Sequence, residues 1–324
     1  MALVVDQILD QTYPNIEVVV TDDGDPGPTR DALSRFGRRI RYEANERRLG
    51  IYGNWNRAIS LARGELVAVY HDHDGYARTM VERSVDLFRR SPRVGVVHVA
   101  AMLVVPGAAL ESALHPELPE IADGRWFAEK QAWQWGSYVA HGAMMVRREL
   151  YERLGVFDES RGIVADMDML IRFALECDVG YVREPLYSYV GRAPGDALFG
   201  FRWRDLEDYI PQRRLNLERV YAREPAKLSK ALAALQRQVD RRLLRSMLYL
   251  SVQGEREQVD EGWPVLARFA SRPAYLGARA LVSESTPIRA SRAMAYGLWR
   301  RRHHIWPPGM RALAGAFTEG TVQS

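Results

Sequence analysis

Short strand-like runs alternate with helix-like segments over residues 1–100, and this alternation limits the possible folds more than any other feature of the sequence. Three apolar or β-branched runs have the length of a buried strand, at residues 16–20, 40–43 and 66–70. Segments with helical spacing lie around them, at residues 4–10, 29–36, 50–62 and 81–90. Strands that alternate with helices predict an α/β fold with a doubly wound, mostly parallel sheet, in which ligands bind at the carboxyl ends of the strands.

The rest of the chain has a different character and predicts a second domain. Residues 94–105 resemble a further strand and residues 165–176 a helix, whereas residues 203–250 are mostly helical and rich in arginine. A length of 324 residues corresponds to about two domains. We therefore expect an α/β domain over residues 1–200 and a mainly helical, arginine-rich extension over residues 201–324.

The composition excludes several classes of protein. Hydrophobic residues make up 47% of the chain and charged residues 27%, as in globular proteins. Cys177 is the single cysteine, which excludes a disulfide framework and a multi-cysteine metal site. The longest apolar run, residues 94–110, is too short and too interrupted to span a membrane, and no secretion leader opens the chain. These features predict a cytoplasmic protein.

The two parts of the chain differ in charge. Residues 1–200 carry 23 Lys or Arg against 29 Asp or Glu, whereas residues 201–324 carry 22 against 12. A basic tail suggests contact with phosphates, an anionic membrane or nucleic acid. Residues 299–306 mix arginine, histidine and tryptophan. This mixture favours a packed helical appendage with a solvated basic face, and peripheral contact with the inner face of an anionic membrane is the alternative. Nucleic-acid binding is not favoured, because no recognised module is present.

An acidic motif follows the third predicted strand, in the run His71-Asp72-His73-Asp74. Asp72 and Asp74 stand two positions apart, so an extended backbone directs both carboxylates to the same side. Oxygen ligands in this arrangement suit Mg²⁺ or Mn²⁺ that bridges a diphosphate. A solvated acidic turn and a transition-metal site with the two histidines are the alternatives.

Other carboxylates allow both a functional and a structural interpretation. Asp22 and Asp23 end the first predicted strand, where they either bind a base and ribose or form a turn with the following glycine. Asp166 opens a predicted helix, so it is either a general base or an N-cap. Asp168 and Arg172 have the spacing of a helical ion pair.

Taken together, the motifs resemble glycosyltransferase family 2, whose members have the GT-A fold. The resemblance covers about residues 3–195 and rests on motifs spread over the α/β part of the chain. In order, they are Gln11-Thr12-Tyr13-Pro14-Asn15, Val18-Val19-Val20-Thr21-Asp22-Asp23-Gly24, Asn54 with Asn56 and Arg57, Tyr70-His71-Asp72-His73-Asp74, Gly155-Val156-Phe157-Asp158 and Ala165-Asp166-Met167-Asp168.

The resemblance implies a GT-A-like fold, a function and roles for single residues. It implies a metal-dependent inverting glycosyltransferase, which moves a sugar from a nucleotide-diphospho-sugar donor to a glycan or lipid-linked acceptor in polysaccharide or glycolipid synthesis. Asp166 would be the catalytic base, and Asp72 and Asp74 would hold Mg²⁺ or Mn²⁺. The residues implied to bind the sugar nucleotide are Asp22, Asp23, Asn56, Arg57 and Asp72.

The chain departs from the family pattern at three places. The chain begins inside the helix that normally follows the first strand of the fold, so that strand is expected to be missing. Ala165 stands where the family usually has a glutamate before the catalytic aspartate, and no histidine lies between His141 and His303. These departures keep an alternative open, namely a truncated, inactive GT-A-like protein that binds nucleotide or serves as a scaffold.

Overall fold

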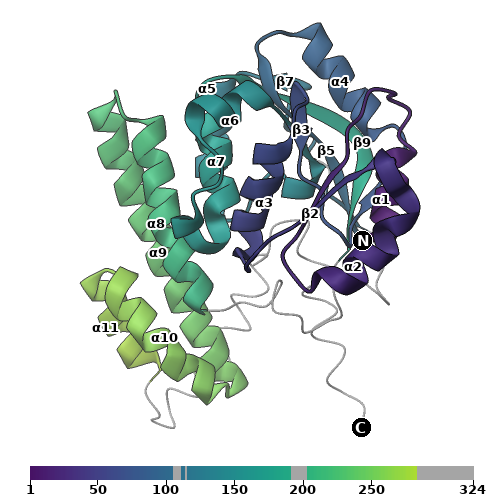
Figure 1. The fold of residues 1–324 in the computed structure, drawn as a ribbon. Helices are drawn as coiled ribbons and strands as arrows, with labels where there is room; N and C mark the ends of the chain where they lie inside the picture. The colour runs from purple at the N-terminus through teal and green to yellow at the C-terminus, as the bar shows by residue number, and fades with distance from the viewer. Residues whose placement is uncertain (105–110, 114, 191–202, 283–324) are drawn as a thin grey trace. The chain divides into compact units, whose positions relative to one another are not determined.

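The computed structural model describes residues 1–104, 111–113, 115–190 and 203–282 (Figure 1). The chain divides into two compact units, Met1–Asp196 and Ala197–Ser324. In the residues that the structure describes, the first unit is an α/β domain and the second consists of helices. None of the described helices combines the length and the hydrophobicity that a membrane-spanning segment requires.

The strands of the first unit form two sheets. The strands are β1 (Val19–Asp22), β2 (Arg41–Ala44), β3 (Leu66–Ala68), β4 (Gly75–Tyr76), β5 (Val94–Val104), β6 (Glu111–Ala113), β7 (Ile121–Ala122), β8 (Met144–Arg147) and β9 (Asp178–Val190). β1 and β2 pair in parallel with each other, and the other strands follow the order β3-β8-β5-β9-β4, with β6 on β5 and β7 on β9. β8 is antiparallel to β3 and β5, and β5 is parallel to β9. The main strands β3, β5 and β9 therefore share one direction, and the predicted α/β class is confirmed.

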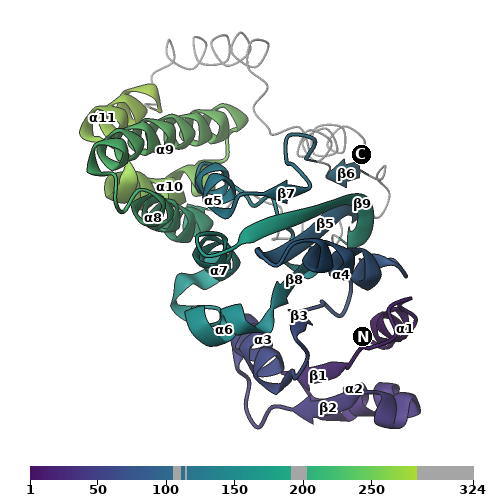
Figure 2. The same cartoon turned by 90° about the horizontal axis from the view of Figure 1, so that it is seen from above.

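Helices cover the larger sheet on both faces. The helices of this unit are α1 (Ala2–Leu9), α2 (Pro26–Leu33), α3 (Gly50–Leu61), α4 (Met80–Arg90), α5 (Gly124–Ala132), α6 (Arg148–Leu154) and α7 (Ala165–Ala174), with short 3₁₀ turns η1 (Ser34–Arg39), η2 (His141–Ala143) and η3 (Glu159–Val164). Val97 of β5 belongs to the core that α4 closes, whereas the next residue, His98, contacts Phe127 of α5. Successive side chains of a strand point to opposite faces, so α4 and α5 cover opposite faces of β5 (Figure 2).

The strand β5 forms the centre of the core. All residues of β5 from Val94 to Ala100 are buried, as expected for a strand that helices cover on both faces. On one face, Val97 and Val99 pack with Val85 and Phe88 of α4. The sequence of α4 favours this helix, because Glu82 lies in its first turn and two arginines lie in its last turn, where they complement the helix dipole.

The second unit is a set of packed helices in its described part. They are α8 (Trp203–Val220), α9 (Pro225–Gln253), α10 (Arg256–Phe269) and α11 (Arg272–Leu281). Gly254 ends α9 with a positive φ of 83°, a conformation that favours glycine. At Gly262 of α10 a Cβ atom would lie 2.6 Å from the Trp203 ring, so the absence of a side chain permits close packing. The predicted helical extension is confirmed for residues 203–282, and the basic segment 299–306 lies outside the described residues.

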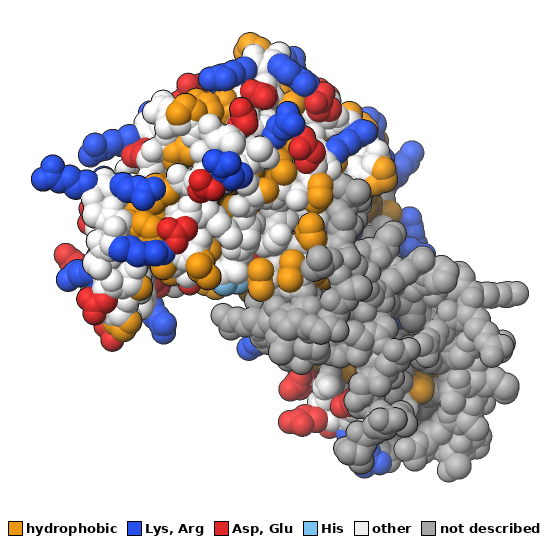
Figure 3. All heavy atoms as spheres, turned by 90° about the vertical axis from the view of Figure 1, so that its right-hand side faces the viewer, with side chains coloured by type: hydrophobic (Ala, Val, Ile, Leu, Met, Phe, Trp, Pro, Cys, Tyr) orange, Lys and Arg blue, Asp and Glu red, His pale blue; other side chains and the backbone are white. Residues whose placement is uncertain are grey.

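Charges of both signs share the surface. On the face of the molecule drawn in Figure 3, acidic and basic side chains are interspersed, with small hydrophobic patches between them. Among the side chains that this view colours, neither sign gathers into a patch.

Candidate active site

Asp22, at the end of β1, is a buried carboxylate with partners inside the protein. It accepts hydrogen bonds from the Tyr42 hydroxyl at 2.8 Å and from the Gly24 N–H at 3.0 Å. Burial and the hydrogen bond to Asp22 raise the pKa of Tyr42 to about 12, so Tyr42 remains a donor at neutral pH. Asp22 therefore joins the end of β1 to β2.

Asp23 binds the start of helix α3. Its carboxylate accepts hydrogen bonds from the backbone N–H groups of Leu49 at 2.6 Å and Gly50 at 2.8 Å, and from the Asn45 amide at 3.0 Å. Burial raises the pKa of this carboxyl, but the hydrogen bonds outweigh burial and hold the pKa below its usual range. The carboxylate satisfies N–H groups that a helix leaves without internal partners.

A cavity of about 490 Å³ opens beside Asp23. Its volume lies in the range of pockets that hold small ligands. The lining residues come from the turn after β1 and the turn before α3, and they are Asp23, Gly24, Asp25, Asn45, Glu46, Arg47 and Arg48. Two adjacent arginines give this rim donors suited to phosphate or carboxylate groups.

The two aspartates after β3 lie in opposite surroundings. The side chain of Asp74 has no exposed surface, and it accepts hydrogen bonds from the His71 Nδ1, the Tyr187 hydroxyl and the Val190 N–H. Burial raises the pKa of this carboxyl, but the three donors outweigh burial and hold the pKa below its usual range. The side chain of Asp72 is 58% exposed, and its carboxylate lies 3.0 Å from the Nδ1 of His73. Of the two carboxylates, only that of Asp72 is open to a ligand.

His71 lies at the centre of an aromatic stack. Its ring is stacked on Trp55 of α3, with centroids 5.0 Å apart, and His141 is stacked on the same indole at 4.4 Å. The Nε2 of His71 lies 3.4 Å from the Nδ1 of His141. Burial, reinforced by the charge of His71, holds the pKa of His141 well below its usual range, so His141 is neutral at physiological pH. Trp55 thus supports both imidazoles from one side.

Asp166 lies in the first turn of α7, where it accepts a hydrogen bond from the Met167 N–H at 2.8 Å. Burial raises the pKa of Asp166 to about 6, although backbone hydrogen bonds and the charge of His71 act in the opposite direction. A carboxyl with this pKa is ionised at neutral pH and still basic enough to accept a proton. His71, which binds Asp74, also favours the ionised form of Asp166 electrostatically.

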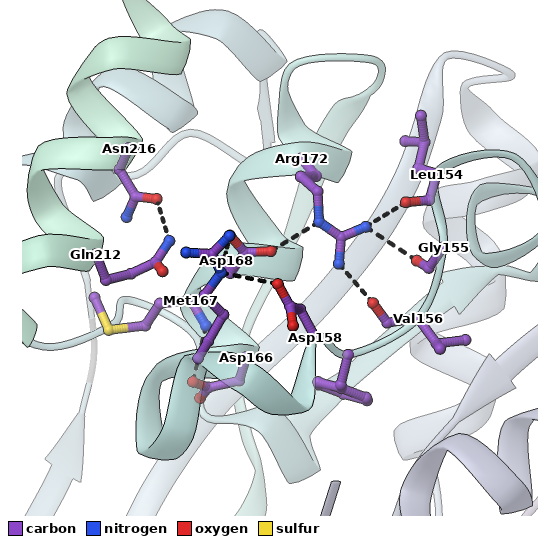
Figure 4. Close-up of polar contacts among 12 residues, drawn as sticks. Leu154, Gly155, Val156, Asp158, Asp166, Met167, Asp168, Arg172, Gln212 and Asn216 are labelled. Carbon is purple, nitrogen blue, oxygen red and sulfur yellow. Dashed lines mark hydrogen bonds and ion pairs between the residues drawn. The ribbon is translucent and has the colours of Figure 1, made fainter. Parts of the chain in front are cut away.

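Asp168 is buried in an ion pair and stabilises the fold (Figure 4). Its side chain is 1% exposed and lies 2.9 Å from the Nε of Arg172, one turn further along α7. Arg172 also donates to the carbonyl oxygens that end α6 and begin the next turn, namely those of Leu154, Gly155 and Val156. The predicted helical ion pair is confirmed, and it ties α7 to the end of α6.

Asn56 and Arg57 have different surroundings, although they are neighbours on α3. The Asn56 side chain donates to the Phe157 carbonyl and accepts from the Phe157 N–H, both at 3.0 Å. Arg57 is exposed. Asn56 therefore fixes the segment that carries Phe157, whose ring lies 5.4 Å from Trp55 and 4.9 Å from His141.

Helix α3 and the ring of His71 connect most of the predicted site residues with one another. Asp23 binds the start of α3, and Trp55, one and a half turns further on, carries His71 on its face. His71 in turn binds Asp74 and influences Asp166. Among the described residues, no group of three or more His, Cys, Asp or Glu side chains is arranged to hold a metal ion.

Three residues that contact His71 or Asp74 were not predicted from the sequence, namely Trp55, His141 and Tyr187. His141 lies 70 positions from His71, and Tyr187 lies 113 positions from Asp74. His141 and Tyr187 do not belong to a sequence motif that would indicate a role in the site. Trp55 lies between Asn54 and Asn56, but no pattern distinguishes it from a core residue of α3.

Residues 2–155 match a family model described as Glycosyl transferase family 2. The chain is 30% identical over 100 residues to an uncharacterized glycosyltransferase of Nostoc sp., a match that covers 29% of this chain and 30% of that protein. It is 24% identical over 186 residues to an uncharacterized glycosyltransferase of Rickettsia typhi, which covers 56% of this chain and 57% of that protein. The chain thus spans less than two thirds of the length of these relatives.

A solved structure supports the fold over most of the chain. The crystal structure of S. aureus TarS 1-349 in complex with UDP has a TM-score of 0.57 with this chain, at 14% identity. The match covers 94% of this chain and 89% of that one. The expected GT-A-like fold is confirmed.

Proposed function

We propose that the chain belongs to glycosyltransferase family 2, whose model matches residues 2–155, and that it is a metal-dependent, inverting glycosyltransferase that uses a nucleotide-diphospho-sugar donor. The acceptor is a hydroxyl group of a glycan or lipid-linked molecule, in the synthesis of a cell-envelope polysaccharide or glycolipid. The observation that carries the proposal is the cluster around His71, which binds Asp74, influences Asp166 and lies next to the exposed Asp72.

Asp166 acts as the general base in this proposal. Its carboxylate takes the proton of the acceptor hydroxyl, and the acceptor oxygen attacks the anomeric carbon from the side opposite the diphosphate. The bond between that carbon and the diphosphate oxygen breaks, the nucleoside diphosphate leaves, and the configuration at the anomeric carbon inverts. The pKa of about 6 suits this role, because it keeps the carboxylate ionised at neutral pH.

The acidic loop after β3 is the proposed place for Mg²⁺ or Mn²⁺. Such an ion, when bound, neutralises charge that develops on the departing diphosphate. Mg²⁺ is usually held by one or two carboxylates together with substrate phosphates, so the exposed Asp72 fits as a protein ligand. The buried Asp74 supports the loop from inside.

The cavity beside Asp23 is the proposed place for the nucleoside part of the donor. Asp23 and Asn45 fix its wall through their hydrogen bond, and Arg47 and Arg48 supply donors at its rim. Asp22 holds the same wall from behind through Tyr42. Two residues of α3 complete the proposed assignment. Asn56 acts by fixing the Phe157 segment, and the exposed Arg57 supplies a positive charge for the nucleotide.

We also propose that the second unit contacts an anionic membrane at its cytoplasmic face. In α11, Leu276 is 56% exposed and Leu281 is 41% exposed. The helix also carries Arg272 and Arg279 and no acidic residue. Exposed leucines beside arginines favour an interface with anionic lipid. Sedimentation with phosphatidylglycerol vesicles should retain the wild type and release the double variant Leu276→Ser/Leu281→Ser, whereas equal retention on phosphatidylcholine vesicles would contradict the charge requirement.

The catalytic proposal is tested with a panel of UDP-, GDP- and dTDP-sugars in the presence of Mn²⁺. We expect at least one donor to bind, and Asp166→Asn to keep that binding while it loses transfer. Asp86→Asn, an exposed carboxylate on α4, is the control and should leave both unchanged. If the wild type binds a donor but transfers its sugar to none of the acceptors that are offered, the result would favour the inactive nucleotide-binding alternative. Loss of binding and transfer together in Asp166→Asn would indicate that Asp166 is a structural cap.

A further inference from the structure

Helix α9 of the second unit carries far more positive than negative charge. Its 29 residues include four arginines and two lysines, against Asp240 as the single acidic residue. The Asp240 carboxylate accepts hydrogen bonds from the Gln236 amide at 3.0 Å and from the Ser271 N–H at 2.8 Å, at the start of α11. This carboxylate therefore stabilises the contact between α9 and α11, and most of the positive charge of α9 remains.

The exposed side chains in the second half of α9 form one row. Within residues 236–250, the exposed residues are Gln236, Arg237, Arg241, Arg245 and Tyr249. The three arginines and the tyrosine, which we call the α9 row, follow one another at a spacing of four and so lie about 6 Å apart along one side of the helix. The aliphatic residues of the same stretch are buried or half-buried. The α9 row thus presents three guanidinium groups and one aromatic ring to solvent.

Carboxylates of the protein do not neutralise the α9 row at Arg237 and Arg241. In the part of the chain that the structure describes, neither side chain forms an ion pair, and the Nε of Arg241 donates to the Arg237 carbonyl oxygen at 3.2 Å. Burial and the charge of Arg241 lower the pKa of Arg245, so the like charges act on each other. Like charges one turn apart destabilise a helix. An anionic ligand along the α9 row would remove this repulsion.

The chemistry of the α9 row fits an acidic glycan. Guanidinium groups bind phosphate and carboxylate groups through charge-assisted hydrogen bonds. Tyr249 is 43% exposed, and the apolar face of such a ring packs on the C–H groups of a sugar. A helix that lies in a membrane interface inserts an apolar face into the lipid. Because the α9 row contains no aliphatic side chain, lipid fits this row less well than a glycan does.

The length of the α9 row favours a chain of anionic groups over a single ion. From Arg237 to Arg245 the row extends about 12 Å, since each residue of a helix adds about 1.5 Å. A chain that carries anionic groups on successive units engages several arginines at once, and this raises its affinity above that of one group.

We propose that the α9 row is a docking surface for an acidic glycan chain, whose phosphate or carboxylate groups bind the three arginines and one of whose sugar rings packs on Tyr249. The inference rests on the proposed function, because it names the class of the glycan acceptor as one with anionic repeating units. Docking at the α9 row holds the acceptor chain on the enzyme and does not take part in the chemical step.

The test measures binding of two labelled probes to the full chain by fluorescence anisotropy. Oligogalacturonate carries a carboxylate on each sugar, whereas dextran of similar length is uncharged. Monomeric galacturonate, inorganic polyphosphate and polyuridylate are offered as competitors. Binding of a nucleoside diphosphate is measured in parallel with Mn²⁺, as a readout of the donor site.

Two variants change the α9 row. The triple variant Arg237→Gln/Arg241→Gln/Arg245→Gln removes its charge and keeps residues that favour a helix. Tyr249→Ala removes the ring and keeps the charge. All four side chains are exposed, so both variants should melt like the wild type.

The matched control is the triple variant Arg214→Gln/Arg223→Gln/Arg268→Gln. It removes the same charge from exposed positions of the same unit that lie outside the α9 row. Arg214 pairs with Glu218 and Arg268 with Glu207, and exposed ion pairs contribute little to stability. A difference between the two triple variants therefore reports the position of the charges and not their number.

We expect the wild type to bind oligogalacturonate more tightly than its monomer, to ignore dextran, and to lose affinity as the NaCl concentration rises. The triple variant of the α9 row should bind oligogalacturonate about tenfold more weakly or worse, because several charged contacts are lost together. The control triple variant should stay within about twofold of the wild type. Tyr249→Ala should bind oligogalacturonate about threefold more weakly and polyphosphate as the wild type does. Nucleoside diphosphate binding should be unchanged in all variants.

Three results would overturn the inference. They are equal oligogalacturonate affinity in the two triple variants, competition by monomeric galacturonate as strong as by the chain, and polyuridylate binding that is tighter than glycan binding and depends on the α9 row, which would indicate a nucleic-acid site. A wild type that binds no nucleoside diphosphate would overturn the proposed function and the glycan's role as acceptor. The polymer measurements would still decide in that case whether the α9 row is a docking surface.

Discussion

The rings of Trp55 and His71 are stacked, with centroids 5.0 Å apart and planes 12° apart. Trp55 belongs to α3, whose first residues bind Asp23, and His71 binds Asp74 in the acidic loop. The stack therefore connects α3, which borders the cavity beside Asp23, with the acidic loop. Removal of the Trp55 ring should destabilise both the cavity and the loop.

Truncation of Trp55 tests this support. Trp55→Ala should lower the free energy of unfolding by about 3 kcal/mol, because a large aromatic side chain with several ring contacts is lost. Trp55→Phe should lower it by about 1 kcal/mol, since part of the stacking remains. Urea unfolding with an unchanged m-value measures both. Trp126→Ala, a tryptophan that is 37% exposed on α5, is the control and should stay within about 0.5 kcal/mol of the wild type.

The pH dependence of transfer follows from Asp166. Because burial raises the pKa of Asp166 to about 6, the base is protonated below that pH and activity should fall as the pH decreases through 6. The rate of transfer at saturating donor, measured from pH 5 to 8, should show this acidic limb. An acidic limb at pH 4, the ordinary range of an aspartate, would contradict the assigned environment.

The same carboxyl should also affect stability. Its pKa is higher in the folded protein than in the unfolded chain, so the unfolded chain releases the proton first and the folded state loses stability as the pH rises from about 4 to 6. Asp166→Asn has no such proton, and its stability relative to the wild type should increase by about 1–2 kcal/mol between pH 4 and pH 7. Urea titrations at the two pH values measure this difference. A difference that does not change with pH would contradict the raised pKa.

His98 should make the fold sensitive to acid. The side chain is 1% exposed, it is stacked on Tyr181, and its Nε2 has no hydrogen-bond partner in the described part of the chain. Burial lowers the pKa of His98 to about 3, so between about pH 6.5 and 3 the unfolded chain binds a proton that the folded protein does not. Stability should therefore decrease as the pH falls through this range, by about 3–5 kcal/mol for this group.

The variant His98→Phe isolates this effect. It keeps an aromatic ring on Tyr181 and removes the titrating group, so it should lose stability less steeply than the wild type between pH 6.5 and pH 4. The measurement is the midpoint of urea unfolding at each pH. Parallel curves for the two proteins would show that His98 does not titrate as its burial requires.

Sequence periodicity predicted the amphipathic helices well and the strands less well. The helices expected at residues 50–62 and 81–90 agree within one residue with α3 and α4, because their apolar faces and their terminal residues give consistent signals. The strand expected at residues 16–20 is shifted to Val19–Asp22, since β1 continues through its acidic residues, where Asp22 pairs with Ala44 and binds Tyr42. The long strand β9 was not expected, because Arg183 and Glu184 interrupt its apolar pattern and pairing with β5 stabilises it instead.

The contacts within the candidate site also could not be predicted from local sequence patterns. Aspartates after strands can be selected by residue type, but the difference between Asp72 and Asp74 depends on donors that β9 supplies from 113 and 116 positions away. Periodicity within a segment carries no information about such contacts. The ion pair of Asp168 and Arg172 was predictable because both residues lie on one helix at a spacing of four.

The central claim is that the acidic side chains from separate segments surround one donor molecule. It is tested most directly by a crystal structure of the protein with Mn²⁺ and the nucleotide-diphospho-sugar that binds best in the panel. We predict the nucleoside in the cavity beside Asp23, the ion in contact with Asp72, and the Asp166 carboxylate facing the anomeric carbon. A donor that is bound elsewhere and contacts neither Asp23 nor Asp166 would contradict this claim.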